Sequence, residues 1–183
     1  MNFKEKLSER IHLKDIYEMM LSAQNMDSKK KELYQALFDT DDKVAYQAAW
    51  VFTHFSLAEN RWLYDKQNEL IDEALVCVHP GKRRLLLTLI FRQPPANPLR
   101  TDFLDFCLTR MISKQELPAV QSLCMKLAYE MCRQIPELRQ ELHSIIELME
   151  PDLLSVAMKS ARNNVLKAMK TGKSMQQVRK SSL

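Results

Sequence analysis

The sequence predicts an all-α protein, and three observations lead to this fold class. Only 2 of the 183 residues are glycine, whereas tight turns between strands and Gly-rich phosphate loops need glycine for positive φ angles or close backbone approach. Residues that favour helices are frequent, including 11 methionines. Apolar residues recur at helical spacing almost from end to end, and no window alternates apolar and polar residues long enough to predict a strand.

The first helices are expected before residue 60. Residues 12–25 form a predicted helix that either starts there or extends backward through three further apolar residues, Phe3, Leu7 and Ile11. Ser28 is the expected N-cap of a second helix. Thr40 is the expected N-cap of a third helix, which carries an apolar stripe from Val44 to Phe55.

The middle of the chain is divided by proline and glycine. A helix over residues 63–78 is expected to end at His79-Pro80-Gly81, because proline interrupts helices and glycine favours their C-terminal caps. A short and almost wholly apolar helix follows over residues 82–92, and the proline-rich residues 94–98 predict a loop.

Four further helices are predicted after this loop. The first covers residues 99–113, and the other three begin at prolines, which the first turn of a helix tolerates: Pro118, Pro136 and Pro151. The apolar pattern fades after Lys170. One domain is therefore expected over residues 1–170, followed by a basic and flexible tail over residues 171–183.

Corresponding apolar positions recur along the chain at a constant offset. Four groups of residues, 48–52, 86–90, 124–128 and, as a partial match, 162–166, follow one another at steps of 38 positions. Chance helices rarely keep one register through the loops between them, so tandem helix pairs are predicted. This period is close to the roughly 40–47 residues of HEAT and armadillo units.

The segment DDKVAYQAAWVF (residues 41–52) resembles the first helix of a HEAT-like repeat, with an acidic start followed by Val and then Ala-Ala-Trp. The resemblance to HEAT and armadillo repeat proteins, including short bacterial HEAT-like proteins, covers residues 41 to about 170. It implies a right-handed α-α superhelix, or solenoid, of about three helix pairs with capping helices at both ends. Small residues such as Ala48 and Ala49 suit this fold because they let neighbouring helices approach closely.

The formal net charge of +4 is unevenly distributed. From Leu153 onward there are seven basic residues and no acidic one. The second helices of the three expected pairs, at 63–78, 99–114 and 136–150, hold ten acidic and five basic residues. Such helices commonly line the concave surface of HEAT-like solenoids, so the resemblance implies a negatively charged groove.

These features predict a non-enzymatic scaffold that binds a protein or peptide, and an acidic groove favours a basic partner. The candidate partner-binding residues are aromatic anchors at the rim of the groove together with nearby acids: Trp50, Trp62, Tyr64, Asp65, Asp72, Asp102 and Asp105. The alternative for both tryptophans is a place in the core.

The alternative function is association with nucleic acid through basic segments. The candidates for phosphate binding are five basic residues, of which the first three begin a helix, where cations are unfavourable: Lys82, Arg83, Arg84, Arg162 and Lys167. The alkylpurine glycosylases of DNA alkylation repair are built from HEAT-like repeats and read DNA along a cationic concave face. The acidic second helices argue against DNA on that face here, and Trp62 with Asp65 only weakly resembles the Trp and Asp that those enzymes place at the lesion.

No motif predicts catalysis, a cofactor or a metal. Thr171-Gly172-Lys173-Ser174 resembles the end of a Walker A loop, but Lys167 stands at the position of the earlier glycine and a helix precedes it. The four histidines are dispersed without an HExxH motif, and no GxSxG nucleophile elbow occurs. The signature loop of the adenylosuccinate lyase family is also absent. An enzyme is therefore the less favoured interpretation.

The four cysteines contain no CxxC pair and fall inside helical patterns, which predicts reduced thiols with a structural role. The first 20 residues carry charges throughout and lack the apolar stretch of a signal peptide. The longest apolar run, at residues 85–91, is far shorter than the roughly 20 residues of a membrane span. A cytoplasmic location without membrane association is expected.

Overall fold

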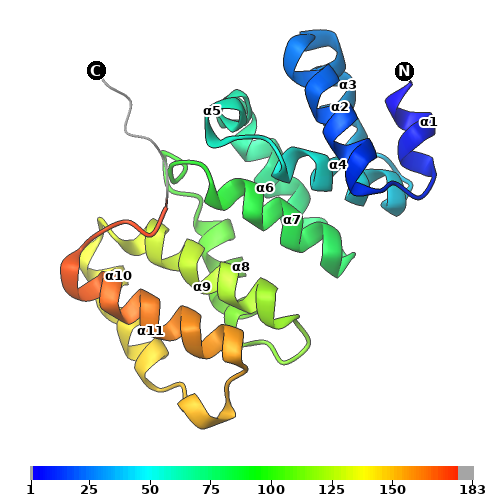
Figure 1. Ribbon diagram of the computed structural model, residues 1–183. Helices are drawn as coiled ribbons and strands as arrows, with labels where there is room; N and C mark the ends of the chain where they lie inside the picture. Colours follow the sequence, from blue (N-terminus) through cyan, green and yellow to red (C-terminus); the bar gives the residue numbers. More distant parts are fainter. Residues whose placement is uncertain (1, 177–183) are drawn as a thin grey trace. The chain divides into compact units, whose positions relative to one another are not determined.

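The computed structural model describes residues 2–176, and these residues fold into helices without any strand (Figure 1). The predicted all-α fold is confirmed for this part of the chain. The chain divides into two compact units, residues 1–89 (unit 1) and residues 90–183 (unit 2). Each unit buries its own set of apolar side chains. The predicted handedness of the superhelix stays a prediction.

Unit 1 is built from short helices joined by tight turns. In chain order these are α1 (Phe3–Ser8), α2 (Leu13–Asn25), α3 (Asp27–Ala36), α4 (Asp42–Thr53), α5 (Leu57–Asn60), the 3-10 helix η1 (Arg61–Lys66), α6 (Gln67–Val76) and α7 (Pro80–Phe91), which continues into unit 2.

Helix α4 is the centre of unit 1, since α1, α2 and α3 each pack against it. Its small residues are fully buried and allow the close approach of these neighbours: Ala45, Ala48 and Ala49. Both predicted caps are displaced, by one residue for α4 and by two residues for α3, whose N-cap is Met26. Asp41 rather than Thr40 caps α4, because its carboxylate accepts a hydrogen bond of 2.9 Å from the Lys43 main chain. Helix α3 begins at Asp27, so Ser28 lies in its first turn.

A buried glutamine separates α1 from α2. The side-chain amide of Gln47 on α4 accepts a hydrogen bond from the Ile11 main chain and donates to the carbonyls of Leu7 and Glu9. These contacts satisfy main-chain groups that a helix end leaves without partners. The two alternatives for this region therefore resolve into two separate helices rather than one extended helix.

The predicted helix over residues 63–78 is divided in two and lies two residues earlier in the chain than expected. It consists of η1 followed by α6, which ends at Val76. Pro80 starts α7 instead of only ending the helix before it. The ring nitrogen Nδ1 of His79 accepts a hydrogen bond of 3.0 Å from the Lys82 main chain, and His79 thereby caps the new helix.

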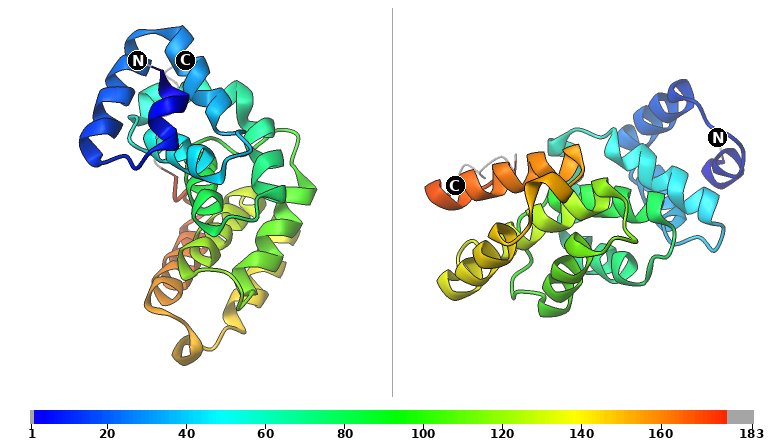
Figure 2. Two further views of the ribbon diagram at one scale, coloured as in Figure 1. Left: turned by 90° about the vertical axis from the view of Figure 1, so that its right-hand side faces the viewer. Right: turned by 90° about the horizontal axis from the view of Figure 1, so that it is seen from below.

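Unit 2 is arranged around one long helix. It contains α8 (Thr101–Ile112), α9 (Pro118–Cys132), α10 (Pro136–Glu147), the 3-10 helix η2 (Pro151–Leu153) and α11 (Val156–Thr171). Helix α9 packs against α8, α10 and α11 (Figure 1 and Figure 2). Because ten of its fifteen residues are buried, α9 forms most of the core of this unit.

Two of the three predicted helix starts at proline are confirmed. Pro118 and Pro136 occupy the first turns of α9 and α10. Pro151 starts only the three-residue helix η2. Helix α11 begins later, at Val156, where the Ser155 hydroxyl accepts a hydrogen bond of 3.3 Å from the Met158 main chain.

The predicted repeat appears directly in the helix boundaries. Helices α4, α7, α9 and α11 begin at residues 42, 80, 118 and 156, so each begins 38 residues after the previous one. The equivalent apolar positions of the first three helices, at residues 48–52, 86–90 and 124–128, are almost entirely buried. In the partial fourth match, Val165 is buried whereas Arg162 and Asn163 are not.

The first part of the predicted tail is held against unit 2. Gly172 ends α11 with a φ of 66°, in the left-handed region that favours glycine. Residues 173–176 then form hydrogen bonds to α9 and to the end of α7. The rest of the predicted tail, residues 177–183, lies outside the described residues.

Candidate functional site

A row of five rings crosses unit 1, and we call it the aromatic row. Its members come from α2, from α4 and from the turn before α7: Tyr17, His54, Trp50, Tyr46 and His79. Adjacent ring centroids lie 5.7, 6.2, 6.5 and 5.5 Å apart in that order. The three members on α4 are spaced by four residues, which places them on one face of that helix. All five rings keep part of their surface in contact with solvent.

Helix α2 is apolar on two faces. Ile16, Met19 and Ala23 are fully buried. Three other large apolar side chains, again spaced by four residues, are 51%, 46% and 54% exposed: Leu13, Tyr17 and Leu21. We call these three residues the α2 stripe. Tyr17 belongs to both features, so the α2 stripe and the aromatic row form one continuous surface of unit 1.

Gly81 allows the end of the aromatic row to close. A Cβ atom at this position would lie 3.0 Å from a ring carbon of Tyr46 and 3.0 Å from a ring carbon of His79. Any larger residue would therefore push these two rings apart. Trp50, one of the predicted anchors, lies within the row and is half-buried.

Trp62, the second predicted anchor, belongs to a separate cluster of rings. It lies parallel to Phe52 at 6.4 Å and edge-on to Tyr34 at 5.5 Å, and the Lys66 ammonium sits 4.0 Å from its centroid. Tyr34 donates a hydrogen bond of 2.9 Å to Glu69, and burial together with this carboxylate raises the pKa of Tyr34. These contacts give Trp62 a role in packing, and the residue is half-buried. Tyr64 is half-buried.

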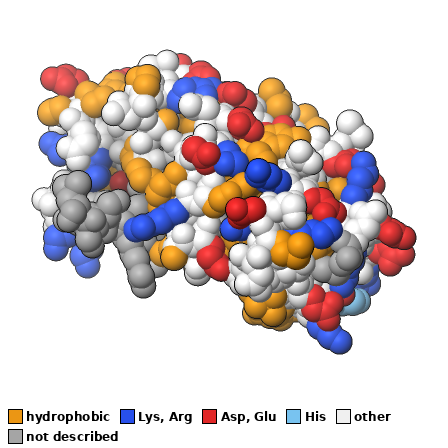
Figure 3. All heavy atoms as spheres, turned by 90° about the horizontal axis from the view of Figure 1, so that it is seen from above, with side chains coloured by type: hydrophobic (Ala, Val, Ile, Leu, Met, Phe, Trp, Pro, Cys, Tyr) orange, Lys and Arg blue, Asp and Glu red, His pale blue; other side chains and the backbone are white. Residues whose placement is uncertain are grey.

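The four predicted acids are all exposed, and Asp65 and Asp102 form ion pairs with neighbouring cations. Asp65 lies 2.8 Å from the Lys66 ammonium. Asp102 lies 2.6 Å from Arg100, and the hydrogen bonds from this guanidinium lower the pKa of Asp102. Asp65 and Asp72 belong to unit 1, whereas Asp102 and Asp105 belong to unit 2. On the face drawn in Figure 3, acidic and basic side chains are interspersed among the described residues.

The predicted phosphate-binding residues at the start of α7 point inward, apart from Arg84. The Lys82 side chain is 5% exposed and its ammonium lies 2.5 Å from Glu73. Arg83 is buried and donates from Nε and Nη2 to the carbonyl of Cys77, the C-cap of α6. Neither charge is presented to a ligand in solution. The two cations at this helix start are thus compensated by Glu73 and by the C-terminal end of α6. Arg84 is half-buried.

The other two predicted phosphate-binding residues lie on α11. Arg162 donates from Nε to the Ile146 carbonyl at 3.1 Å and from Nη2 to the Glu147 carbonyl at 3.4 Å. It thereby completes the C-terminal end of α10. Lys167 is exposed. Three of the five predicted cations, Lys82, Arg83 and Arg162, are thus committed to main-chain or carboxylate partners.

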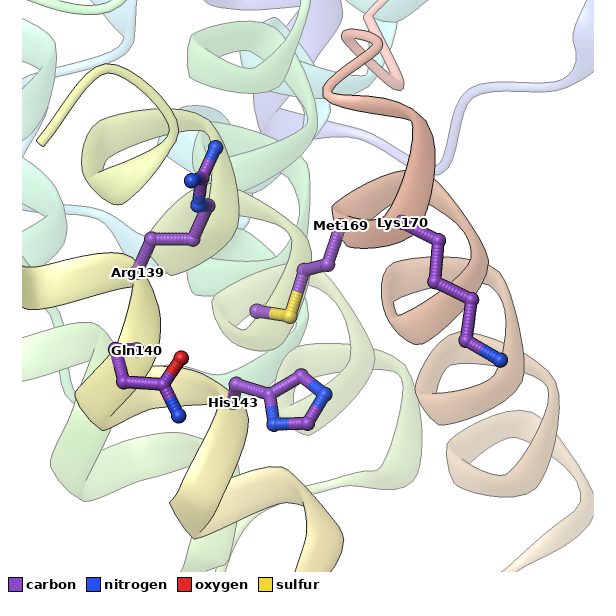
Figure 4. Close-up of a pocket in the computed structure, with 5 residues that line it drawn as sticks. All are labelled: Arg139, Gln140, His143, Met169 and Lys170. Carbon is purple, nitrogen blue, oxygen red and sulfur yellow. The ribbon is translucent and has the colours of Figure 1, made fainter. Parts of the chain in front are cut away.

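A pocket of about 200 Å³ lies between α10 and α11, and the sequence motifs do not predict it. Its lining is mainly polar and carries positive charge: Arg139, Gln140, His143, Met169 and Lys170. Figure 4 shows Met169 reaching from α11 toward His143, while the Lys170 side chain points away from the other four. The spacing of Arg139 and His143 by four residues places both on one face of α10 and is the one sequence feature that could have pointed to this pocket.

Within residues 2–176, no three His, Cys, Asp or Glu side chains lie close enough together to hold a metal ion. No helix in this range is long and apolar enough to cross a membrane. The four cysteines are free and buried, and burial raises the pKa of Cys77, Cys107 and Cys132.

Comparison with known proteins gives one result. The family model of the HEAT repeat domain matches residues 3–169, which covers nearly all of both units. No curated protein and no solved structure matches the chain.

Proposed function

Because the chain belongs to the HEAT repeat domain family, we propose that it is a non-enzymatic scaffold that binds a partner protein through the α2 stripe and the aromatic row. HEAT repeats generally mediate protein binding. The observation that carries the proposal is the second apolar face of α2, where Leu13, Tyr17 and Leu21 are about half exposed.

The spacing of the α2 stripe favours a helical partner segment. Residues four apart form a ridge along a helix, and such ridges pack into the groove of another helix. In repeat proteins each helix pair is covered by its neighbour, so an apolar face left open on an outer helix suits a helix from another chain. The rings of Trp50 and His54 continue this surface and supply rigid contact area.

The partner's expected chemistry is an amphipathic helix with basic residues beside its apolar face. Exposed acids on unit 1, such as Asp72, favour association with a basic segment and speed its encounter more than they add affinity. The four free and buried thiols support a reducing compartment, so the proposed setting is the cytoplasm.

Site-specific photo-crosslinking tests this proposal. A benzophenone amino acid at Leu21 is expected to capture one partner segment whose apolar residues are spaced three and four apart. The matched control is the same substitution at Val78, which is 81% exposed and belongs to the same unit outside the stripe. Identical products from both positions, or no product from position 21, would contradict the proposal.

A synthetic peptide of the captured segment then gives the affinity. Each leucine of the stripe has about half of its surface left to bury, worth ~1 kcal/mol. The double variant Leu13→Glu/Leu21→Glu is therefore expected to weaken binding about 30-fold or more. Val78→Glu should leave binding unchanged. Equal affinity of the double variant and the wild type would exclude the α2 stripe as the docking surface.

A further inference from the structure

The segment that follows α11, residues 172–176, lies along unit 2 and is drawn in red in Figure 1. It is held by polar contacts at both ends. The Tyr129 hydroxyl donates a hydrogen bond of 2.8 Å to the Lys173 carbonyl. The Gln176 side-chain amide donates to the carbonyls of Phe91 and Gln93 at 2.9 and 2.7 Å, where α7 ends. The segment thus bridges α9 and the last residues of α7, which belong to unit 2, without forming a helix itself.

A buried carboxylate holds the middle of this segment. Glu130 on α9 is 2% exposed. It accepts hydrogen bonds from the Ser174 hydroxyl at 2.9 Å and from the Met175 main chain at 2.5 Å, and its other partner is Arg133 at 3.3 Å. A buried carboxylate without donors is costly. If the segment leaves, Glu130 loses one main-chain donor and one hydroxyl donor, so this position favours a peptide that supplies both.

The segment is held mainly by hydrogen bonds rather than by apolar burial. Lys173 and Ser174 are exposed, and Met175 and Gln176 are only half-buried, so little apolar surface is covered. The hydrogen bonds of the segment must therefore offset the conformational entropy that is lost when these residues become ordered. Two of the contacts, at the Lys173 carbonyl and the Met175 amide, recognise main-chain atoms that any extended peptide offers.

The site also has an unused polar group. The side-chain amide of Gln93 belongs to a residue that is 1% exposed, and neither its oxygen nor its nitrogen has a hydrogen-bond partner among residues 2–176. The main-chain carbonyl of the same residue accepts from Gln176. An amide buried without partners beside the bound segment indicates that the segment does not use every group of the site.

We propose that α9 and the end of α7 form a binding site for an extended peptide, which residues 173–176 occupy in cis and which a segment of a partner protein takes over. The preferred peptide carries a hydroxyl residue where Ser174 now contacts Glu130. An acidic or phosphorylated residue at that place is excluded, because it would face the buried carboxylate. This site belongs to unit 2 and is independent of the α2 stripe.

Competition in the full-length protein tests the proposal. The probe is a fluorescein-labelled peptide with the sequence of residues 171–179, TGKSMQQVR, followed by fluorescence polarisation. Ser174→Glu in the protein brings a negative charge against Glu130 and displaces the cis segment. This variant is expected to bind the probe at least tenfold more tightly than the wild type, whose own segment competes at high effective concentration. Ser174→Ala, which removes one hydrogen bond, is expected to change binding less than threefold.

Two controls distinguish specific recognition of the peptide from binding caused by partial unfolding of the variant. In the Ser174→Glu background, Tyr129→Phe removes only the hydroxyl that binds the Lys173 carbonyl and should weaken probe binding about fivefold. A probe with Glu in place of its Ser should not bind. Circular dichroism and thermal melting verify the fold, and hydrogen exchange at the Met175 amide reports release of the segment. The proposal is overturned if Ser174→Glu binds the probe no better than the wild type, or if Tyr129→Phe and the Glu probe make no difference.

Discussion

Gln47→Ala is expected to destabilise unit 1 far more than the loss of one polar side chain usually does. The Gln47 side chain is the partner of three main-chain groups, at Leu7, Glu9 and Ile11, and the residue is 6% exposed. Each main-chain group left without a partner inside the protein costs at least ~1 kcal/mol. The contacts to Leu7 and Ile11 are buried, whereas Glu9 is exposed and water can replace its contact, so the expected loss in the free energy of unfolding is about 2 kcal/mol.

Urea unfolding followed by tryptophan fluorescence measures this loss in the correct unit, because both tryptophans, Trp50 and Trp62, lie in unit 1. Gln35→Ala is the matched control, since Gln35 is an exposed glutamine of the same unit and should change stability by less than about 0.5 kcal/mol. If Gln47→Ala stays within 0.5 kcal/mol of the wild type, water replaces the amide and the role assigned to Gln47 is refuted.

Three further outcomes are expected. Lys82→Ala leaves Glu73 without its cation and should lower the stability of unit 1 by about 2 kcal/mol, because Glu73 is only 21% exposed; adding Glu73→Ala should restore part of the loss. Gly172→Ala should lower the free energy of unfolding of unit 2 by ~1 kcal/mol, and with it the melting temperature, through the left-handed φ alone, since a Cβ there meets open space. Burial raises the pKa of Cys132 to about 11, so roughly one thiol in a thousand is ionised at pH 8; mass spectrometry should find no iodoacetamide adduct on Cys132 in the native protein and four adducts on the chain in urea.

The helices and their repeat could be predicted because they depend on neighbours in the sequence. The prolines at 118 and 136 mark helix starts, and the spacing of 38 residues follows from apolar positions alone. The gap between α1 and α2 could not be predicted in the same way. It depends on Gln47, which lies 36 to 40 residues away from the groups it binds.

The roles of the charged residues were harder to predict than the helices. Lys82 and Arg83 stand at a helix start, where the macrodipole disfavours them, and for this reason they are predicted from the sequence as candidates for phosphate binding. Their partners, Glu73 and the Cys77 carbonyl, meet them only through the turn between α6 and α7. The apolar residues of α2 were recognised as helical, but the pattern alone does not distinguish the face that packs against α4 from the face that remains open.

The equal spacing of α4, α7, α9 and α11 has an evolutionary consequence. Duplication or deletion of one 38-residue segment would return every following helix to the same place in the pattern. The junction would then join surfaces already adapted to each other, and no core would have to be redesigned. The length of such a chain can therefore change by whole 38-residue repeats. The loss of a few residues within one repeat would instead shift all following helices out of register.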